Sequence, residues 1–290
     1  MATIVGLGEV LWDVFADHKR PGGAPCNVAY QAAQLGHRGI VATRVGADAL
    51  GEELVTFLHG RGVDTSCIQT DQEHPTGTVE VTITDGEPSY VITENVAWDY
   101  LVLDDRLRHI AATADAICYV SLAQRAPTTR ATIQAMLTMA HPDALRVFDV
   151  NLRPPFIDVN VLIDSFAHAN VVKMGEGEAE DVARLLGRSD LTNWLLNEQG
   201  AEVVCITRGK DGAELITKEA QALRKGERVD TSGGDAVGVG DAFLAATTHG
   251  LLRRWPLADV LDFANRYAAL IVTKRGGMPM LSKAELAAFL

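Results

Sequence analysis

The sequence has 290 residues, of which 47% are hydrophobic and 22% are charged, and it contains 26 glycines, 10 prolines and 4 cysteines. This composition is typical of a globular protein with a large core, and it excludes a disordered chain, a collagen-like chain and a small disulfide-stabilised domain. Acidic residues outnumber basic residues 38 to 26, and the formal charge of −12 should repel nucleic acids and anionic membranes.

The cysteines and the N-terminal residues indicate the compartment. Cys26, Cys67, Cys118 and Cys205 are too widely spaced for a CxxC metal or redox motif, so we expect reduced and mostly buried thiols. The first ten residues contain Glu9 and no basic region, and no apolar run approaches the roughly 18 residues of a membrane span. We therefore expect a cytoplasmic protein with no signal peptide and no membrane partner.

Short apolar segments rich in β-forming residues alternate with helical patterns along most of the chain. Strands are expected at 3–8, 39–45, 116–120, 146–150, 171–173 and 203–207, and helices at 27–35, 50–59, 128–140 and 257–271. This alternation is typical of a mainly parallel sheet with helices on both faces. The sequence therefore predicts a single Rossmann-like, three-layer α/β/α domain over residues 1–290.

A different pattern interrupts this alternation between residues 78 and 93. Apolar and polar residues alternate from Thr78 to Thr84, a turn is expected at Asp85 and Gly86, and a second extended segment follows at 89–93. This pattern predicts an antiparallel hairpin. Neighbouring extended segments should join it, so that residues of about 9–17 and 76–99 form a small sheet. We interpret this sheet as a lid or a dimer surface, and the alternative is a solvent-facing hairpin without a function.

Gly6 and Gly8, after the first expected strand, invite comparison with a dinucleotide-binding fingerprint. The third glycine of that fingerprint is absent, because Leu11 occupies its position, and the following residues continue as a strand. A P-loop sequence is absent as well. These two glycines are therefore better explained by close packing of the backbone.

The sharpest local feature is the glycine-rich start of an alanine-rich helix that we expect to end near Gly250. Gly238, Val239 and Gly240 lead directly to Asp241. Unpaired N–H groups at a helix N-terminus favour an anion. Asp241 has two interpretations at this stage: it caps its own helix, or it is a general base beside an anion hole for a transferred phosphoryl group.

A second cluster of polar residues lies near the N-terminus. Gly22, Gly23 and Asn27 belong to a polar, glycine-rich loop, and Asn27 is expected to cap the helix that follows. Asp13 ends the extended segment before this loop. Carboxylate and amide side chains form paired hydrogen bonds with hydroxyl groups, and glycines let the backbone approach a ligand. The cluster therefore suits a ligand with several hydroxyls.

Five motifs occur in order along the chain. They are Gly-Glu-x-Leu-x-Asp at 8–13, Gly-Gly-Ala-Pro-x-Asn-Val-Ala at 22–29, Asp-Val-Asn-Leu-Arg-Pro at 149–154, Thr-Arg-Gly-Lys-Asp-Gly at 207–212 and Gly-Val-Gly-Asp at 238–241. With these motifs the chain resembles the ribokinase family, also called the PfkB-type carbohydrate kinases. Within that family, segments 12–15 and 92–99 are most similar to bacterial fructokinases.

The resemblance implies transfer of the ATP γ-phosphate to a sugar hydroxyl on a ribokinase-like domain with a β-sheet lid that often forms a dimer. It makes Asp241 the catalytic base, with the N–H groups of Gly238, Val239 and Gly240 as the anion hole. The residues implied for sugar binding are Asp13, Gly22, Gly23, Asn27, Asn151 and Arg153. Those implied for the nucleotide are Lys173, Thr207, Gly209, Gly212 and Asn265, and those implied for metal ions are Glu178 and Asp235.

The chain departs from the family pattern at three positions. Ala236 and Val239 replace the usual threonine and alanine, and Gly175 replaces an asparagine of the magnesium motif. The branched Val239 side chain should narrow the anion hole, while its backbone donors remain. Glu178 could still orient the water shell of Mg²⁺, Glu176 or Glu180 could substitute for it, and the alternative is that all three are solvated acids at a helix start.

Together these features predict an ATP- and Mg²⁺-dependent kinase for a small sugar, most similar to a D-fructose kinase, acting as a homodimer through the lid sheet. Activation by K⁺ at the loop of Asp235 is left open. One alternative is a kinase of the same fold for ribose, a nucleoside or a sugar acid such as 2-keto-3-deoxygluconate. A nucleoside would have only Tyr90 and Trp98 to stack on, and a sugar acid would need a cationic clamp. The candidate clamps are Arg20, Arg44 and Arg153. A second alternative is a sugar-binding sensor without turnover.

Overall fold

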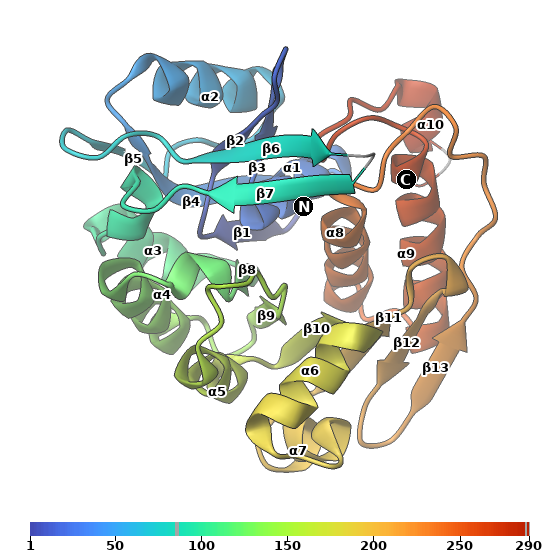
Figure 1. Ribbon diagram of the computed structural model, residues 1–290. Helices are drawn as coiled ribbons and strands as arrows, with labels where there is room; N and C mark the ends of the chain where they lie inside the picture. The colour runs from blue at the N-terminus through green and yellow to red at the C-terminus, as the bar shows by residue number, and fades with distance from the viewer. Residues whose placement is uncertain (85–86, 288, 290) are drawn as a thin grey trace.

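The computed structural model describes residues 1–84, 87–287 and 289 of the chain, and Figure 1 shows their arrangement. In these residues nine strands form one sheet in the order β13-β12-β11-β10-β9-β8-β1-β4-β5. Neighbours are parallel except at the pairs β11–β12 and β12–β13. The strands are β1 Thr3–Leu7, β4 Arg38–Gly46, β5 Ile68–Asp71, β8 Ala116–Val120, β9 Leu145–Asp149, β10 Val171–Gly175, β11 Val203–Thr207, β12 Ala213–Ile216 and β13 Gln221–Arg224.

Helices cover both faces of this sheet. The α-helices are α1 Ala24–Gln34, α2 Ala49–Gly60, α3 Asp105–Thr113, α4 Pro127–Met139, α5 Val159–His168, α6 Glu176–Leu186, α7 Leu191–Asn197, α8 Val239–Leu252, α9 Leu257–Val272 and α10 Lys283–Ala287. The 3₁₀ helices are η1 Ala97–Tyr100, η2 Leu122–Gln124 and η3 Gly209–Asp211.

Successive strand residues enter two separate cores, because side chains alternate between the faces of a sheet. Val171 and Val203 pack with α1, α8 and α9. Their neighbours Val172 and Val204 pack with α3 to α7 on the other face. The predicted three-layer α/β/α fold is therefore confirmed.

A second sheet has the order β3-β2-β6-β7 and is visible as a separate layer in Figure 1. Its strands are β2 Leu11–Val14, β3 Lys19–Gly22, β6 Thr78–Thr84 and β7 Glu87–Ile92. Strands β6 and β7 pair antiparallel, as the sequence predicts, and β2 joins β6 in parallel. The turn expected at Asp85 and Gly86 lies outside the described residues.

Two expectations near this sheet are wrong. Residues 20–27 do not form one loop, because β3 occupies Lys19–Gly22 and α1 begins at Ala24. Asn27 is not the helix cap: Gly23 holds that position with φ 106°, and proline lies in the first turn, where its missing N–H costs nothing. The side chain of Asn27 is thereby available for a contact elsewhere.

The packing interpretation of Gly6 and Gly8 is confirmed. A Cβ atom on Gly6 would lie 1.9 Å from the carbonyl oxygen of Pro25, so α1 could not approach β1 with any other residue there. Gly8 has φ +144° and packs against Ala123 and Pro25. The cysteines are buried and unpaired, as expected. In the described part of the chain, every helix is too short or too polar to cross a membrane.

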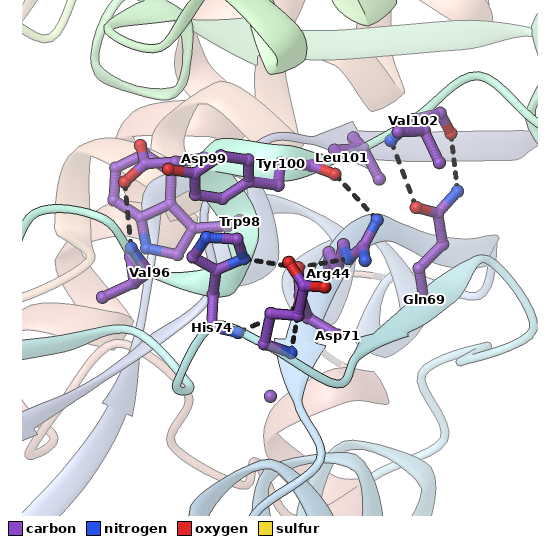
Figure 2. Close-up of polar contacts among 12 residues, drawn as sticks. Arg44, Gln69, Asp71, His74, Val96, Trp98, Asp99, Tyr100, Leu101 and Val102 are labelled. Carbon is purple, nitrogen blue, oxygen red and sulfur yellow. Dashed lines mark hydrogen bonds and ion pairs between the residues drawn. The ribbon is translucent and has the colours of Figure 1, made fainter.

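The segment that follows β7 is anchored to the large sheet by the polar cluster in Figure 2. Asp71 at the end of β5 accepts N–H groups from Glu73 and His74 at 2.8 and 3.0 Å, and pairs with Arg44 at 2.8 Å. Arg44 also donates to the carbonyl oxygen of Tyr100, and the His74 ring stacks on Tyr100 at 3.6 Å. The expectation that the chain stays extended from residue 90 to residue 99 is partly wrong, because residues 97–100 form η1.

Candidate active site

The predicted site residues gather at the carboxyl ends of the parallel strands, the edge at which α/β proteins bind ligands. Segment 8–11 follows β1, the segment with Asn151 and Arg153 follows β9, and Gly175 ends β10. The start of α8 reaches the same edge, because Asp241 contacts Asn27 of α1. The sheet thus brings together residues that are more than 200 positions apart in the sequence.

The start of α8 presents unpaired backbone donors. Gly238 is in the left-handed conformation with φ +71° and precedes the helix. The first N–H group of the helix start with a good acceptor is that of Ala242, which donates to Gly238 at 2.9 Å. Within the described residues, the N–H groups of Gly238, Gly240 and Asp241 have no acceptor, whereas that of Val239 donates to Ala236 at 3.4 Å. The helix start can therefore receive an anion.

Asp241 does not cap its helix, so the capping interpretation is wrong. Its carboxylate accepts one hydrogen bond in the described structure, from Nδ2 of Asn27 at 2.7 Å. Burial raises the pKa of Asp241 above its ordinary value, although the Asn27 amide, Lys173 and Arg153 act in the opposite direction. A carboxylate with one donor and a raised pKa is suited to accept a proton.

A buried ion pair lies behind these donors. Nζ of Lys173 is 3.0 and 2.9 Å from the two carboxylate oxygens of Asp149. A Cβ atom on Gly240 would lie 3.4 Å from this ammonium group, so the charge is adjacent to the helix start. Burial lowers the pKa of Lys173, but the Asp149 carboxylate outweighs it and the pKa is raised. The sequence prediction included Lys173 and missed Asp149, whose signal is the first residue of the motif at 149–154.

Asp13 of β2 lies beside Gly22 of β3, and Gly23 is the N-cap of α1 that follows. A Cβ atom on Gly22 would lie 2.7 Å from Oδ2 of Asp13, so glycine leaves room for that carboxylate. A Cβ atom on Gly23 would lie 2.5 Å from the carbonyl oxygen of Glu9. Burial raises the pKa of Asp13 to about 6, although Arg20 and Arg153 lower it. No hydrogen-bond donor reaches the Asp13 carboxylate from the residues that the structure describes.

Glu9 is a buried acid of this site that the sequence prediction missed. Its Oε1 atom accepts the N–H of Ala24 at 3.2 Å, while Oε2 has no partner among the described residues. Burial raises the pKa of Glu9 to about 7, and Arg153 lowers it. Arg153 also lowers the pKa of Asp13 and Asp241, and it donates only to the Leu152 carbonyl oxygen in this part of the structure. One exposed guanidinium group thus faces several carboxyl groups.

Glu178 is already bonded to the backbone. Its two oxygens accept the N–H groups of Leu152 and Gly175, both at 2.8 Å. These bonds attach the loop after β9 to the start of α6. The loop turns at Asn151, which has φ +41° and accepts a hydrogen bond from Ser121 at 3.4 Å. The structure therefore explains Glu178 as a support for the loop that carries Asn151, and its metal role stays a prediction.

Asp235 joins the small sheet to the loop before α8. Its carboxylate pairs with Arg20 at 2.9 Å, and it accepts N–H groups from Gly276 and Val237 at 3.1 Å. These donors occupy the carboxylate, so a role in binding K⁺ also stays a prediction. In the described parts of the chain no cluster of His, Cys, Asp and Glu could enclose a metal ion. Glu178 and Asp235, the two carboxylates predicted for metal ions, would suit Mg²⁺ that keeps its waters and is held by substrate phosphates.

Lys173 is on β10, and the other residues predicted for the nucleotide lie between the end of β11 and the start of β12, and on α9. Thr207 ends β11, and a Cβ atom on Gly209 would meet open space. Gly212 has a packing role, because a Cβ atom there would lie 2.0 Å from the carbonyl oxygen of Arg224. Asn265 donates to the carbonyl oxygen of Lys225 at 3.2 Å. The open side of Gly209 leaves room for a ligand, whereas Gly212 and Asn265 have local structural contacts.

A cavity of about 250 Å³ opens beside this site, and its lining includes Asp99, Tyr100, Arg125 and Phe156. Arg125 donates to both carboxylate oxygens of Asp99 at 2.8 Å and lies over the ring of Trp98. Asp241 and the donors of α8 do not line this cavity. Nη1 of Arg125 has no partner among the described residues. Because Arg125 donates to both oxygens of Asp99 and to the carbonyl oxygen of Thr93, we regard it as an anchor for the segment after β7 and expect the chemistry at Asp241.

Known proteins with similar sequences and structures show the family of this chain. Residues 4–284 match the model of the pfkB family carbohydrate kinases. The chain is 32% identical over 303 residues to a sugar kinase of Pyrococcus horikoshii, covering 98% of this chain and 94% of that protein. It is 28% identical over 301 residues to the fructokinase of Salmonella typhimurium, covering 97% and 96%. The solved structure of an uncharacterized sugar kinase from P. horikoshii in complex with ATP superimposes with a TM-score of 0.86 at 28% identity, covering 100% and 98% of the two chains.

Proposed function

Because the chain belongs to the pfkB family of carbohydrate kinases, we propose that it transfers the γ-phosphate of ATP to a hydroxyl group of D-fructose. Kinase activity follows from the family, and the choice of sugar is our proposal. One observation carries the proposal most directly. Among the described residues the Asp241 carboxylate accepts a hydrogen bond from Asn27 alone, and it lies at a helix start where the N–H groups of Gly238, Gly240 and Asp241 have no acceptor.

In the proposed reaction Asp241 takes the proton of the attacking sugar hydroxyl. The sugar oxygen forms a bond to the γ-phosphorus, the bond between that phosphorus and the β–γ bridging oxygen breaks, and ADP leaves. The N–H groups of Gly238, Gly240 and Asp241 are placed to stabilise the charge on the transferred group. Lys173, 3.4 Å from a Cβ atom built on Gly240, adds positive charge behind them. Mg²⁺ would reach the site with ATP, where Glu178 would orient its water shell, and it would offset the negative charge of the phosphates.

The charges around the site favour a neutral sugar over a sugar acid. Two of the candidate clamps are occupied, since Arg20 pairs with Asp235 and Arg44 pairs with Asp71. Arg153 is the remaining clamp, and it faces Asp13, Asp241 and Glu9. A carboxylate ligand would compete with these acids for a single guanidinium group. A neutral ketose needs no such clamp, which supports D-fructose.

The small sheet supports two further proposals, a lid over the sugar and a dimer interface. Tyr90 and Val91 on β7 are 59% and 61% exposed, and β7 is an edge strand of its sheet. We propose that β7 pairs with the small sheet of a second copy. Sedimentation velocity at micromolar concentration should give a dimer, and Val91→Lys should give a monomer. A monomeric wild type would contradict this arrangement.

The proposed activity is tested by ADP release from Mg²⁺ and ATP across D-fructose, tagatose, ribose, 2-keto-3-deoxygluconate and adenosine. We expect turnover with D-fructose, and Asp241→Asn should reduce it by about 10³-fold or more. Turnover with another compound would correct the substrate and keep the kinase. A folded protein without turnover on any compound, yet with sugar binding, would favour the sensor alternative.

A further inference from the structure

Gln31 is a buried amide for which the proposed reaction has no direct use. Gln31 lies on α1 and is fully buried. Its Nε2 atom donates to the carbonyl oxygen of Gly277 at 3.0 Å. Its Oε1 atom accepts from the Tyr267 hydroxyl at 2.7 Å and from Nε2 of Gln34 at 3.1 Å. The amide therefore joins α1, α9 and the segment that follows α9.

Gly277 is the part of that segment nearest to the reactive groups. A Cβ atom on Gly277 would lie 2.7 Å from both Nδ2 and Oδ1 of Asn27. On its other side, a Cβ atom on Gly238 would lie 2.4 Å from the Cα atom of Gly277. The backbone of Gly277 therefore fills a layer one residue thick between the amide that holds Asp241 and the glycine that opens the anion hole.

Asn27 and Gln31 both lie on α1, and both contact Gly277. Residues four positions apart lie on the same face of a helix. Asn27 donates to Asp241 at 2.7 Å, and one turn later Gln31 holds the Gly277 carbonyl oxygen at 3.0 Å. Because α1 is a rigid element, these two bonds hold the Asn27 amide against the Asp241 carboxylate and the Gly277 backbone against Asn27 and Gly238.

We propose that Gln31 is a positioning residue for phosphoryl transfer, and that its amide keeps the Gly277 backbone against Asn27 and Gly238, so that Asn27 holds the Asp241 carboxylate in the orientation that the reaction needs. This inference rests on the proposed kinase function. A shift of about 1 Å in a reacting group can reduce a rate about 100-fold, so a small movement of Gly277 should be visible in kcat. Substrate contacts of Asp13 and Gly22 are not attached to Gln31 and should be unaffected.

Tyr30 provides a control on the same helix. Its hydroxyl group donates to the carbonyl oxygen of Pro279 at 2.9 Å, two residues beyond Gly277. Tyr30→Phe therefore removes a buried hydrogen bond between α1 and the same segment and leaves the hydrogen bonds of the Gln31 amide in place. A residue that merely stabilises the fold would behave like Tyr30.

The test compares Gln31→Met with Tyr30→Phe in the full chain, by thermal unfolding and by steady-state kinetics with D-fructose, Mg²⁺ and ATP. We expect a loss of Tm in both variants. In Gln31→Met, kcat should fall about 10- to 100-fold while both KM values stay within about twofold, and in Tyr30→Phe kcat should stay within about twofold. Equal kcat losses in the two variants, or an unchanged kcat in Gln31→Met, would overturn the inference.

Tyr267→Phe keeps the inference testable if Gln31→Met does not fold. It removes the hydroxyl group that orients the Gln31 amide and leaves the aromatic ring in the core, and we expect kcat to fall about threefold with both KM values unchanged. An unchanged kcat in this variant would contradict the positioning role of Gln31. A wild type without turnover on any sugar would overturn the proposed function itself, whereas an active wild type with indifferent variants overturns only the role of Gln31.

Discussion

Two buried carboxylate groups at the edge of the large sheet differ in how many donors they receive. Asp71 is bonded by the N–H groups of Glu73 and His74, by Nδ1 of His74 at 3.2 Å and by Arg44. Among the residues that the structure describes, Asp241 accepts a single hydrogen bond, from Asn27.

This difference in bonding gives the two carboxyl groups opposite pKa shifts. Burial would raise the pKa of Asp71, but the N–H groups of Glu73 and His74 and the Arg44 guanidinium outweigh it, and the pKa is lowered. At Asp241 burial prevails and the pKa is raised. A carboxylate that accepts several hydrogen bonds stays charged and stabilises the structure around it, whereas a carboxylate with few donors can exchange a proton. Motifs alone do not separate these two cases: the glycine run marks Asp241 as the start of a helix, but no local pattern shows how many donors each aspartate receives.

The largest expected effect is the loss of activity in Asp241→Asn. Kinetics should show kcat reduced by about 10³-fold or more, because the variant cannot accept the hydroxyl proton. Thermal unfolding should show no loss of stability, since the neutral amide removes a charge that burial disfavours. Residual turnover within tenfold of the wild type would place the base elsewhere.

Asp71→Ala should show the reverse pattern. Removing this carboxylate leaves Arg44 without its buried partner, and urea unfolding should show a loss of about 3 kcal/mol. The kcat of the folded fraction should remain within about twofold of the wild type. Asp181→Ala removes an exposed pair with Arg184 and is a suitable control, with an expected change below about 0.5 kcal/mol. A large drop in kcat for Asp71→Ala would mean that the anchored segment takes part in the reaction.

Glu9→Gln should change the pH dependence of stability. Burial raises the pKa of Glu9 from 4.5 to about 7, so its contribution to stability is complete below the lower value and is lost as the pH rises to the higher one. Glutamine resembles the neutral acid and removes this loss. Urea unfolding should show that, from pH 5 to pH 8, the free energy of unfolding of the variant rises relative to that of the wild type by at most about 3 kcal/mol. A constant difference between the two pH values would contradict the burial of this acid.

The smallest effect concerns the acid limb of the pH–rate profile. The base must be deprotonated, and burial raises the pKa of Asp241, so kcat/KM should decline at a pH above the ordinary range of an aspartate. Asn27 donates to the charged form, so Asn27→Ala should move this limb to higher pH by a few tenths of a unit. Movement to lower pH would show that another group controls the limb.

Much of the fold and part of the site were predictable from the sequence. The alternation of strands and helices predicts the layers because burial on one face or on both follows the local period of apolar residues. The glycine run before Asp241 predicts a helix start with free donors, and the structure has them. The loop expected at 20–27 is wrong because β3 forms by pairing with β2, a contact between separate segments.

The sequence by itself determined the three-layer architecture, the family motifs and most of the polar residues at the sheet edge. The tertiary structure alone decided which acids receive donors. The Asn27 bond to Asp241, the Lys173 pair with Asp149 and the Gln31 bond to Gly277 all join distant segments. The same holds for the burial of Glu9. A carboxyl group's proton affinity depends on its solvent exposure and its neighbours in space, and local sequence patterns contain neither quantity.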